Sequence, residues 1–202
     1  MLDKTKIEFE LGCRLPREEW LWLNGVGIFE DPGLRKYVAP FPPPELMQNV
    51  SGLSNESDFA AHGNDIFTAL EVASPRRLAE FARILDFGCG CGRLARMFKG
   101  HPHQVFGCDI DERHVRFVNQ SFDHMTAKLS QTHPPLPYPN DYFDAIISIS
   151  VFTHLNERSQ DEFLADLHRV SAPGAFLFLT THGGRALQRA LEEDAIWKLI
   201  AV

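Results

Sequence analysis

An apolar run that ends in an acid and leads into three alternating glycines constrains this chain more than any other feature. Residues 82–92 read ARILDFGCGCG, with Gly88, Gly90 and Gly92 at every second position. Glycine lets a backbone turn sharply and approach a ligand without a Cβ in the way. The pattern therefore predicts a buried strand, a tight ligand-binding turn, and a helix whose first N–H groups face a carboxylate or phosphate.

Downstream of this turn, apolar strands alternate with amphipathic helices. We expect strands over 83–88, 103–110, 142–150 and 175–182, helices over 93–100, 112–120, 157–170 and 184–200, and a weak further strand within 123–142. Asp111 is placed to cap the second helix, and Phe163, Leu164, Leu167 and Val170 form one apolar face of the third. Near-continuously apolar strands predict a mostly parallel sheet with helices on both faces, a doubly wound α/β fold. The ligand crevice of such a fold lies at the carboxyl ends of its strands.

The first 80 residues carry a different pattern. Residues 56–80 have helical periodicity with a break at Pro75, and the proline cluster at 39–46 predicts a stiff, non-helical connector. We expect residues 1–80 to form a helical extension or lid, and residues 81–202 to form the ligand-binding domain.

The composition of the chain bears on three questions: whether it binds nucleic acid, whether it enters a membrane or is secreted, and whether it holds a metal. The formal net charge of −7 argues against a nucleic-acid binder, and neither an apolar run of about 18 residues nor a secretory signal occurs. The four cysteines include no Cys-x-x-Cys pair, which favours reduced thiols and a cytoplasmic protein. Cys89 and Cys91 could be metal ligands, but small side chains in a crowded turn explain them better, so no metal is expected. The oligomeric state is left open.

Two familiar glycine loops do not fit this turn. A dinucleotide fingerprint needs its third glycine at position 93, which is Arg93, and no Gly-Lys-Ser/Thr follows as in a P-loop. Asp109 ends the second predicted strand 21 residues after Gly88, where a carboxylate can accept both hydroxyls of a ribose. The alternative role of Asp109, capping the next helix, suits Asp111 better. The sequence therefore predicts a ribose-bearing ligand.

Four stretches resemble, in the same order, the motifs of class I S-adenosylmethionine-dependent methyltransferases. ILDFGCGCGRLAR is similar to the family's first motif and VFGCDIDERHV to its second. PPLPYPNDYFDAIISISVFTHL and LHRVSAPGAFLFLTTH resemble the later segments. The resemblance covers residues 82–182 and implies a Rossmann-like methyltransferase fold with S-adenosylmethionine as cofactor.

The resemblance also implies roles for individual residues. Gly88, Cys89 and Gly90 would line the methionine part of the cofactor, Asp86 would support the turn or the ammonium, and Asp109 would hold the ribose. The other implied contacts are Ile110 against adenine, Thr132 and His133 at the adenine edge, and backbone groups of Ser148 and Ile149. The acid that the family usually places near the adenine edge is absent.

Methyl transfer needs mainly alignment of the reacting groups, and a base helps when the acceptor must lose a proton. His154 follows the 142–150 strand and is the candidate base, with a structural role as the alternative; we expect His101, His103, His114 and His168 to be solvated. SISVF after that strand lacks the Asn/Asp-Pro-Pro-aromatic motif of DNA amino-methyltransferases, and the paired-glutamate loop of protein-arginine enzymes is missing. A small organic acceptor is favoured, with O- or N-methylation ahead of C-methylation, and no nucleic-acid or membrane partner.

Two other function classes compete with this interpretation. Arg93 disfavours a nicotinamide oxidoreductase. A non-catalytic cofactor-binding or interaction module would use the proline segment and exposed Trp20 and Trp22 to contact a partner. The family's sheet usually has seven strands, and the sequence ends just after the last predicted helix, so we expect a shortened sheet or a fragment.

Overall fold

A computed structural model describes residues 15–184 and 188 of the chain. The N-terminal part contains α1 (Arg17–Trp22), a π-helical turn η3 (Leu23–Gly27), α2 (Ile28–Glu30), η4 (Pro32–Tyr37), α3 (Pro44–Ser51), α4 (Glu56–Ala73) and η5 (Leu78–Glu80). The remainder contains β1 (Ile84–Phe87), η6 (Ala95–Phe98), β2 (Val105–Asp109), α5 (Glu112–Ser121), β3 (Met125–Leu129), β4 (Phe143–Ser148), η7 (Phe152–His154), α6 (Glu157–Val170) and β5 (Ser171–Leu179).

The five strands form one parallel sheet in the order β3-β2-β1-β4-β5. The chain runs outward from β1 to β3 and then returns to place β4 on the other side of β1. Such a reversal opens a crevice at the carboxyl ends of the two central strands. The predicted doubly wound α/β fold is confirmed, including the weakly predicted third strand.

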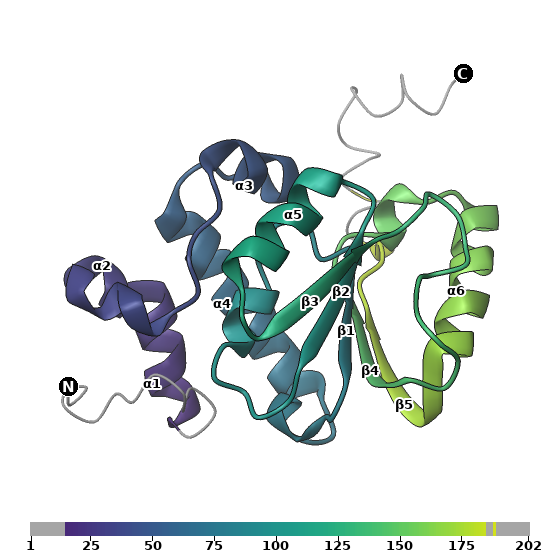
Figure 1. Cartoon of the computed structure of the whole chain (residues 1–202), viewed down its shortest axis with the longest axis horizontal. Coiled ribbons are helices and arrows are strands. Elements are labelled where there is room, and N and C mark those ends of the chain that lie inside the picture. Colours follow the sequence, from purple (N-terminus) through teal and green to yellow (C-terminus); the bar gives the residue numbers. More distant parts are fainter. Residues whose placement is uncertain (1–14, 185–187, 189–202) are drawn as a thin grey trace.

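Successive side chains of a strand point to opposite faces of a sheet, and the strands divide their apolar residues accordingly. Ile84, Ala145 and Ile147 pack with the N-terminal helices and α5, whereas Leu85 and Ile146 pack with α6. Figure 1 shows α4 and α5 on one side of the sheet and α6 on the other. Helices therefore cover both faces, as the apolar strands required.

Local signals fix the helix ends. The side chains of Asn55, Asp111 and Asn156 accept backbone N–H groups at the starts of α4, α5 and α6. Pro44 occupies the first turn of α3, and Gly52 ends that helix in the left-handed conformation with φ of 70°. The predicted cap at Asp111 is confirmed, but the non-helical connector ends at Pro43, because proline is compatible with a first helical position.

The N-terminal helices share one core with the sheet. Trp20, Leu23 and Ile28 belong to the same buried cluster as Ile84 and Val105. The Trp20 indole is 3% exposed and donates its Nε1–H to the Met97 carbonyl at 3.0 Å. The expectation that Trp20 is exposed is therefore wrong.

Three further expectations differ from the structure. Residues 93–100 form only the four-residue 3₁₀ segment η6 instead of a helix. Leu164 on α6 is 40% exposed, because it lies beside the buried stripe and not within it. The last strand is not fully buried, since β5 is the edge of the sheet in the described structure and its Phe176 and Leu177 are 41% and 40% exposed.

The predicted helix over 184–200 lies almost entirely outside the described residues. Within the described ranges, no helix combines the length and the apolar character needed to cross a membrane.

Candidate functional site

A cavity of about 690 Å³ opens at the carboxyl ends of β1, β2 and β4. This volume falls within the range of sites for small molecules and cofactors. The cavity walls come from the glycine turn after β1, the start of α5 after β2, the segment after β3, and the η7 segment after β4, with α3 contributing from the N-terminal part. The site thus lies where the strand order reverses.

The backbone of the glycine turn lies against two close neighbours, Val151 and Val50. Gly88, Gly90 and Gly92 have φ angles of 75°, 53° and 84°, a conformation that residues with a Cβ rarely adopt. A Cβ on Gly88 would lie 2.2 Å from Val151 Cγ2, and one on Gly90 would lie 2.6 Å from Val50 Cγ2. The first two glycines therefore let α3 and the segment after β4 close on the turn.

Hydrogen bonds join the same turn to the end of β2. The N–H groups of Gly88 and Cys89 both donate to the Cys108 carbonyl, at 2.9 and 3.0 Å. The Gly90 N–H donates to Asp109 Oδ2 at 2.8 Å. These three N–H groups are committed to β2, and the four-residue η6 is too short to present the helix N-terminus that we expected for a ligand.

Asp109 is a carboxylate fixed in orientation. Its Oδ2 accepts the Gly90 N–H and its Oδ1 accepts the Asp111 N–H at 2.9 Å. Each carboxylate oxygen has lone pairs for more than one donor. Both oxygens can therefore still accept a hydroxyl from a ligand in the cavity, which fits the vicinal diol of a ribose.

Asp86 lies at the other end of the turn with an incomplete set of partners. Its side chain is buried and its Oδ2 has no hydrogen-bond partner in the described structure. Burial raises the pKa of the Asp86 carboxyl to about 7, against the opposing effect of the Arg93 guanidinium. An unsatisfied carboxylate oxygen beside the cavity is suited to a cationic group such as an ammonium. The residues present thus fit a ligand with an ammonium at one end and a ribose at the other.

The structure brings most of the sequence-predicted residues to this cavity. Asp86, Gly88, Cys89, Gly90, Asp109, Ile110, Thr132, Ile149 and His154 all line it. Ile110 is 61% exposed, so an apolar surface at the mouth is available to a flat ring.

Two predicted residues lie elsewhere. Ser148 is fully buried and does not line the cavity, and its carbonyl accepts the Thr180 N–H at 3.1 Å within the sheet. His133 lines a separate open groove with Glu162 and Arg169. The chain turns away from the cavity after Thr132 toward the α6 face, which carries His133 out of reach.

Sequence reasoning missed several lining residues. Val50 and Asn49 come from α3, and the sequence carries no local signal that this distant segment faces the turn. Arg93 is 7% exposed, and its Nη1 contacts His62 Nδ1 at 3.3 Å. His114 lines the cavity and is 6% exposed, so the expectation that it is solvated is wrong. The regular spacing of His114 with the buried Val118, four residues later on α5, could have indicated its inward face.

His154 ends η7 and borders an apolar part of the cavity formed by Val151, Leu155 and Phe163. Its side chain is exposed. His154 therefore borders a region that could hold an apolar acceptor. Its exposed position alone does not distinguish a catalytic role from a structural one.

The cysteines of the site are thiols without a metal signature. Cys89, Cys91 and Cys108 are free and buried, and burial raises the pKa of each. Across the described residues, no three His, Cys, Asp or Glu side chains are grouped so as to hold a metal ion. Their small size suits the crowded turn, where Cys89 Sγ would lie 2.9 Å from a Cβ on Gly107.

Comparison with known proteins finds a family model described as a methyltransferase domain, which matches residues 84–174. Those residues contain β1 to β4, α5, α6 and the start of β5, and hence most of the cavity wall. The chain is also 30% identical over 105 residues to the cyclopropane-fatty-acyl-phospholipid synthase of Escherichia coli strain K12, covering 51% of this chain and 27% of that protein. It is 28% identical over 110 residues to the ajmaline N-methyltransferase of Rauvolfia serpentina, covering 52% of this chain and 37% of that protein.

Among solved structures, a TehB-like S-adenosylmethionine-dependent methyltransferase from Corynebacterium glutamicum is similar in fold. It aligns with a TM-score of 0.51 and 25% identity over 74% of this chain and 83% of the other. The chain spans only about a quarter to two fifths of the two sequence relatives described above.

Proposed function

The chain belongs to the class I S-adenosylmethionine-dependent methyltransferase family through residues 84–174, and from this premise we propose that it methylates a small organic acceptor. One observation carries the proposal. Two carboxylates, Asp86 and Asp109, lie at the ends of adjacent strands on either side of one glycine turn and line one cavity. That spacing of acids suits a ligand with a cationic amino acid part and a ribose.

Each chain group has a distinct part in this proposal. Asp109 accepts the ribose hydroxyls, Asp86 faces the ammonium, and the backbone from Gly88 to Gly90 lines the part between them. Ile110 and Thr132 border the adenine region. S-adenosylmethionine, when bound, supplies a methyl group activated by its positively charged sulfur, so the protein needs chiefly to align the acceptor.

We assign the acceptor to the apolar region bounded by Val151, Leu155 and Phe163. His154 borders that region and is the candidate base that takes the acceptor's proton, which favours O- or N-methylation of a small, largely apolar molecule. The two sequence relatives are named for different compounds, a fatty-acyl phospholipid and ajmaline, so their names do not indicate one acceptor for this chain.

Three free buried thiols support a reducing, cytoplasmic location.

Isothermal titration calorimetry tests the cofactor part of the proposal. Wild type should bind S-adenosylmethionine and S-adenosylhomocysteine, and Asp109→Ala should weaken both by roughly ten- to a hundredfold, because a charged acceptor is lost. Asp161→Ala, at an exposed position of α6, is the matched control and should bind as wild type does. Equal affinity of Asp109→Ala and wild type would contradict the ribose assignment, and tighter binding of NADH would indicate an oxidoreductase.

A methyl-transfer screen over small hydroxyl and amine acceptors tests the catalytic part. Once an acceptor is found, His154→Ala should lower kcat most at low pH, where the acceptor stays protonated without a base. Cofactor binding without transfer to any acceptor would instead favour a non-catalytic cofactor-binding module.

A further inference from the structure

His114 is a buried polar side chain that the fold leaves without partners. It lies in the first turn of α5, lines the cavity and is 6% exposed. Both ring nitrogens, Nδ1 and Nε2, lack a hydrogen-bond partner in the described structure. Buried polar groups are nearly always hydrogen-bonded, so this imidazole requires an explanation that packing alone does not give.

The position of the ring relates it to Asp109. His114 Nδ1 lies 3.5 Å from Asp109 Oδ1, without a hydrogen bond between them. The same oxygen accepts the Asp111 N–H, and Oδ2 accepts the Gly90 N–H. Asp109 is therefore held by the backbone and does not depend on His114 for its orientation.

The two side chains differ in what they can offer a ligand. The Asp109 carboxylate only accepts hydrogen bonds, whereas a neutral imidazole has one donor and one acceptor nitrogen. A ribose hydroxyl donates one proton and also has lone pairs to be satisfied. The oxygen of a hydroxyl that donates to Asp109 can thus still accept a hydrogen bond. His114 is a neighbouring side chain of the cavity whose ring nitrogens have no partner, so it can supply the N–H donor.

We propose that His114 is a specificity-determining residue that donates a hydrogen bond to one ribose hydroxyl held by Asp109, so that the pair selects a ribonucleoside over a deoxyribonucleoside. This inference rests on the proposed cofactor. The His114 imidazole would contact the ligand directly, unlike residues that only support the glycine turn.

A double-mutant cycle between the protein and the ligand tests the contact. S-adenosylhomocysteine and its 2′-deoxy and 3′-deoxy analogues are titrated calorimetrically into wild type, His114→Leu and His114→Gln. Wild type should bind both deoxy analogues more weakly than the parent compound, because each lacks a hydroxyl that Asp109 accepts, and should bind one of them roughly a further tenfold more weakly, which corresponds to the additional hydrogen bond from His114. His114→Leu should bind the parent compound more weakly and lose this further tenfold difference between the two analogues, and His114→Gln, which keeps an N–H donor, should recover part of it.

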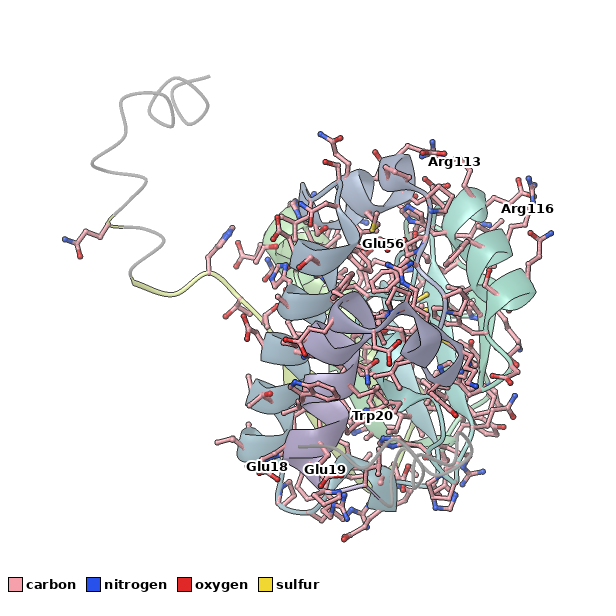
Figure 2. The ribbon with its side chains drawn as sticks, turned by 90° about the vertical axis from the view of Figure 1, so that its left-hand side faces the viewer. Glu18, Glu19, Trp20, Glu56, Arg113 and Arg116 are labelled. Atoms are coloured by element: carbon pink, nitrogen blue, oxygen red, sulfur yellow. The ribbon has the colours of Figure 1, made fainter. Side chains whose placement is uncertain are left out.

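Controls separate this contact from a structural role. Arg116 projects from the outer side of the same helix (Figure 2), and it forms an ion pair with Glu112, so Arg116→Ala should discriminate as wild type does. The thermal midpoint of ligand-free His114→Leu should be no lower than that of wild type, because no native hydrogen bond is removed.

Equal weakening of all three ligands by His114→Leu, or unchanged discrimination, would overturn the assignment. If His114→Leu does not fold, unchanged discrimination in His114→Gln together with an unchanged parent affinity would overturn it. Failure of the proposed function is distinct, because wild type would then bind none of the three ligands.

Discussion

At the scale of single residues, Asp86 links the chemistry of the cavity to pH. Burial raises its pKa to about 7, Arg93 opposes that shift, and Asp109 adds to it. In the free protein the carboxyl is therefore protonated below about pH 7 and cannot attract an ammonium. Ionisation near neutral pH thus controls whether Asp86 carries a negative charge beside the cavity.

We expect cofactor affinity to fall as the pH drops below about 7, by up to about tenfold per pH unit, because binding must then release the proton on Asp86. Calorimetry with S-adenosylhomocysteine between pH 5.5 and 7.5 measures this slope. Asp86→Asn should bind weakly with no such slope. In Arg93→Met the midpoint should move to higher pH, since the cation that lowers the Asp86 pKa is gone. A flat wild-type profile would contradict the assignment of the ammonium to Asp86.

Residues in contiguous motifs could be predicted from sequence, and residues brought in by tertiary packing could not. Asp86 is the penultimate residue of β1 and Asp109 is the last residue of β2, so the parallel pairing of the two strands alone places both acids at the carboxyl end of the sheet. Val50 reaches the turn only because α3 packs over Gly90, and nothing near residue 50 indicates that contact. His133 lies in a separate groove and not in the cavity, and a strand pattern does not encode the path that the loop takes after Thr132.

At the scale of elements, the segment after the glycine turn explains why a predicted helix is missing. Gly92 and Gly100 both have left-handed φ angles, 84° and 81°, so only seven residues separate two helix-incompatible points. A helix of fewer than two turns forms too few hydrogen bonds to offset the unfavourable free energy of helix nucleation. The short 3₁₀ segment η6 forms instead. The glycines that form the turn therefore also limit the length of the helix that follows them.

Gly92→Ala should destabilise the protein by about 2–4 kcal/mol, because left-handed backbone strain adds to overpacking. A Cβ at Gly92 would lie 2.3 Å from Phe122 Cε2. Gly52→Ala is the matched control, since Gly52 has φ of 70° but nothing within 4 Å of the added Cβ; it should cost only about 1 kcal/mol. Urea unfolding measures both variants, and equal costs would show that the packing of Phe122 does not contribute.

At the scale of the whole molecule, the shared core predicts one cooperative unit. Trp20 packs in the cluster that contains Ile84, and its indole bonds to Met97. We therefore expect residues 15–80 not to unfold separately from the sheet. In a Trp197→Phe variant, tryptophan fluorescence reports on Trp20 and Trp22, whereas far-ultraviolet circular dichroism reports on all helices and strands. The two urea transitions should coincide, and an earlier fluorescence transition would indicate an independent N-terminal unit.

The stability of the whole molecule toward acid depends on His101, which bridges the N-terminal helices and η6. Its ring packs edge-on against Phe67 and Phe98, and burial together with His124, Arg77 and His103 lowers its pKa to about 4. Because the folded pKa lies below the unfolded value near 6.5, the unfolded chain binds the extra proton between pH 6.5 and 4. Stability is therefore lost as the pH falls through that window.

His101→Phe keeps an aromatic ring at this position but removes the titrating group, so it should reduce the acid-induced loss of stability by about 1–3 kcal/mol. Asp86 acts in the opposite direction, since its raised folded pKa lowers stability as the pH rises from about 4 to 7. The total slope of wild type is thus the sum of opposing contributions, and the difference between wild type and His101→Phe isolates the histidine. Urea unfolding at pH 7 and pH 4.5 measures that difference. An identical loss in both proteins would mean that His101 is already protonated in the folded state, and that the ring contacts with Phe67 and Phe98 tolerate its charge.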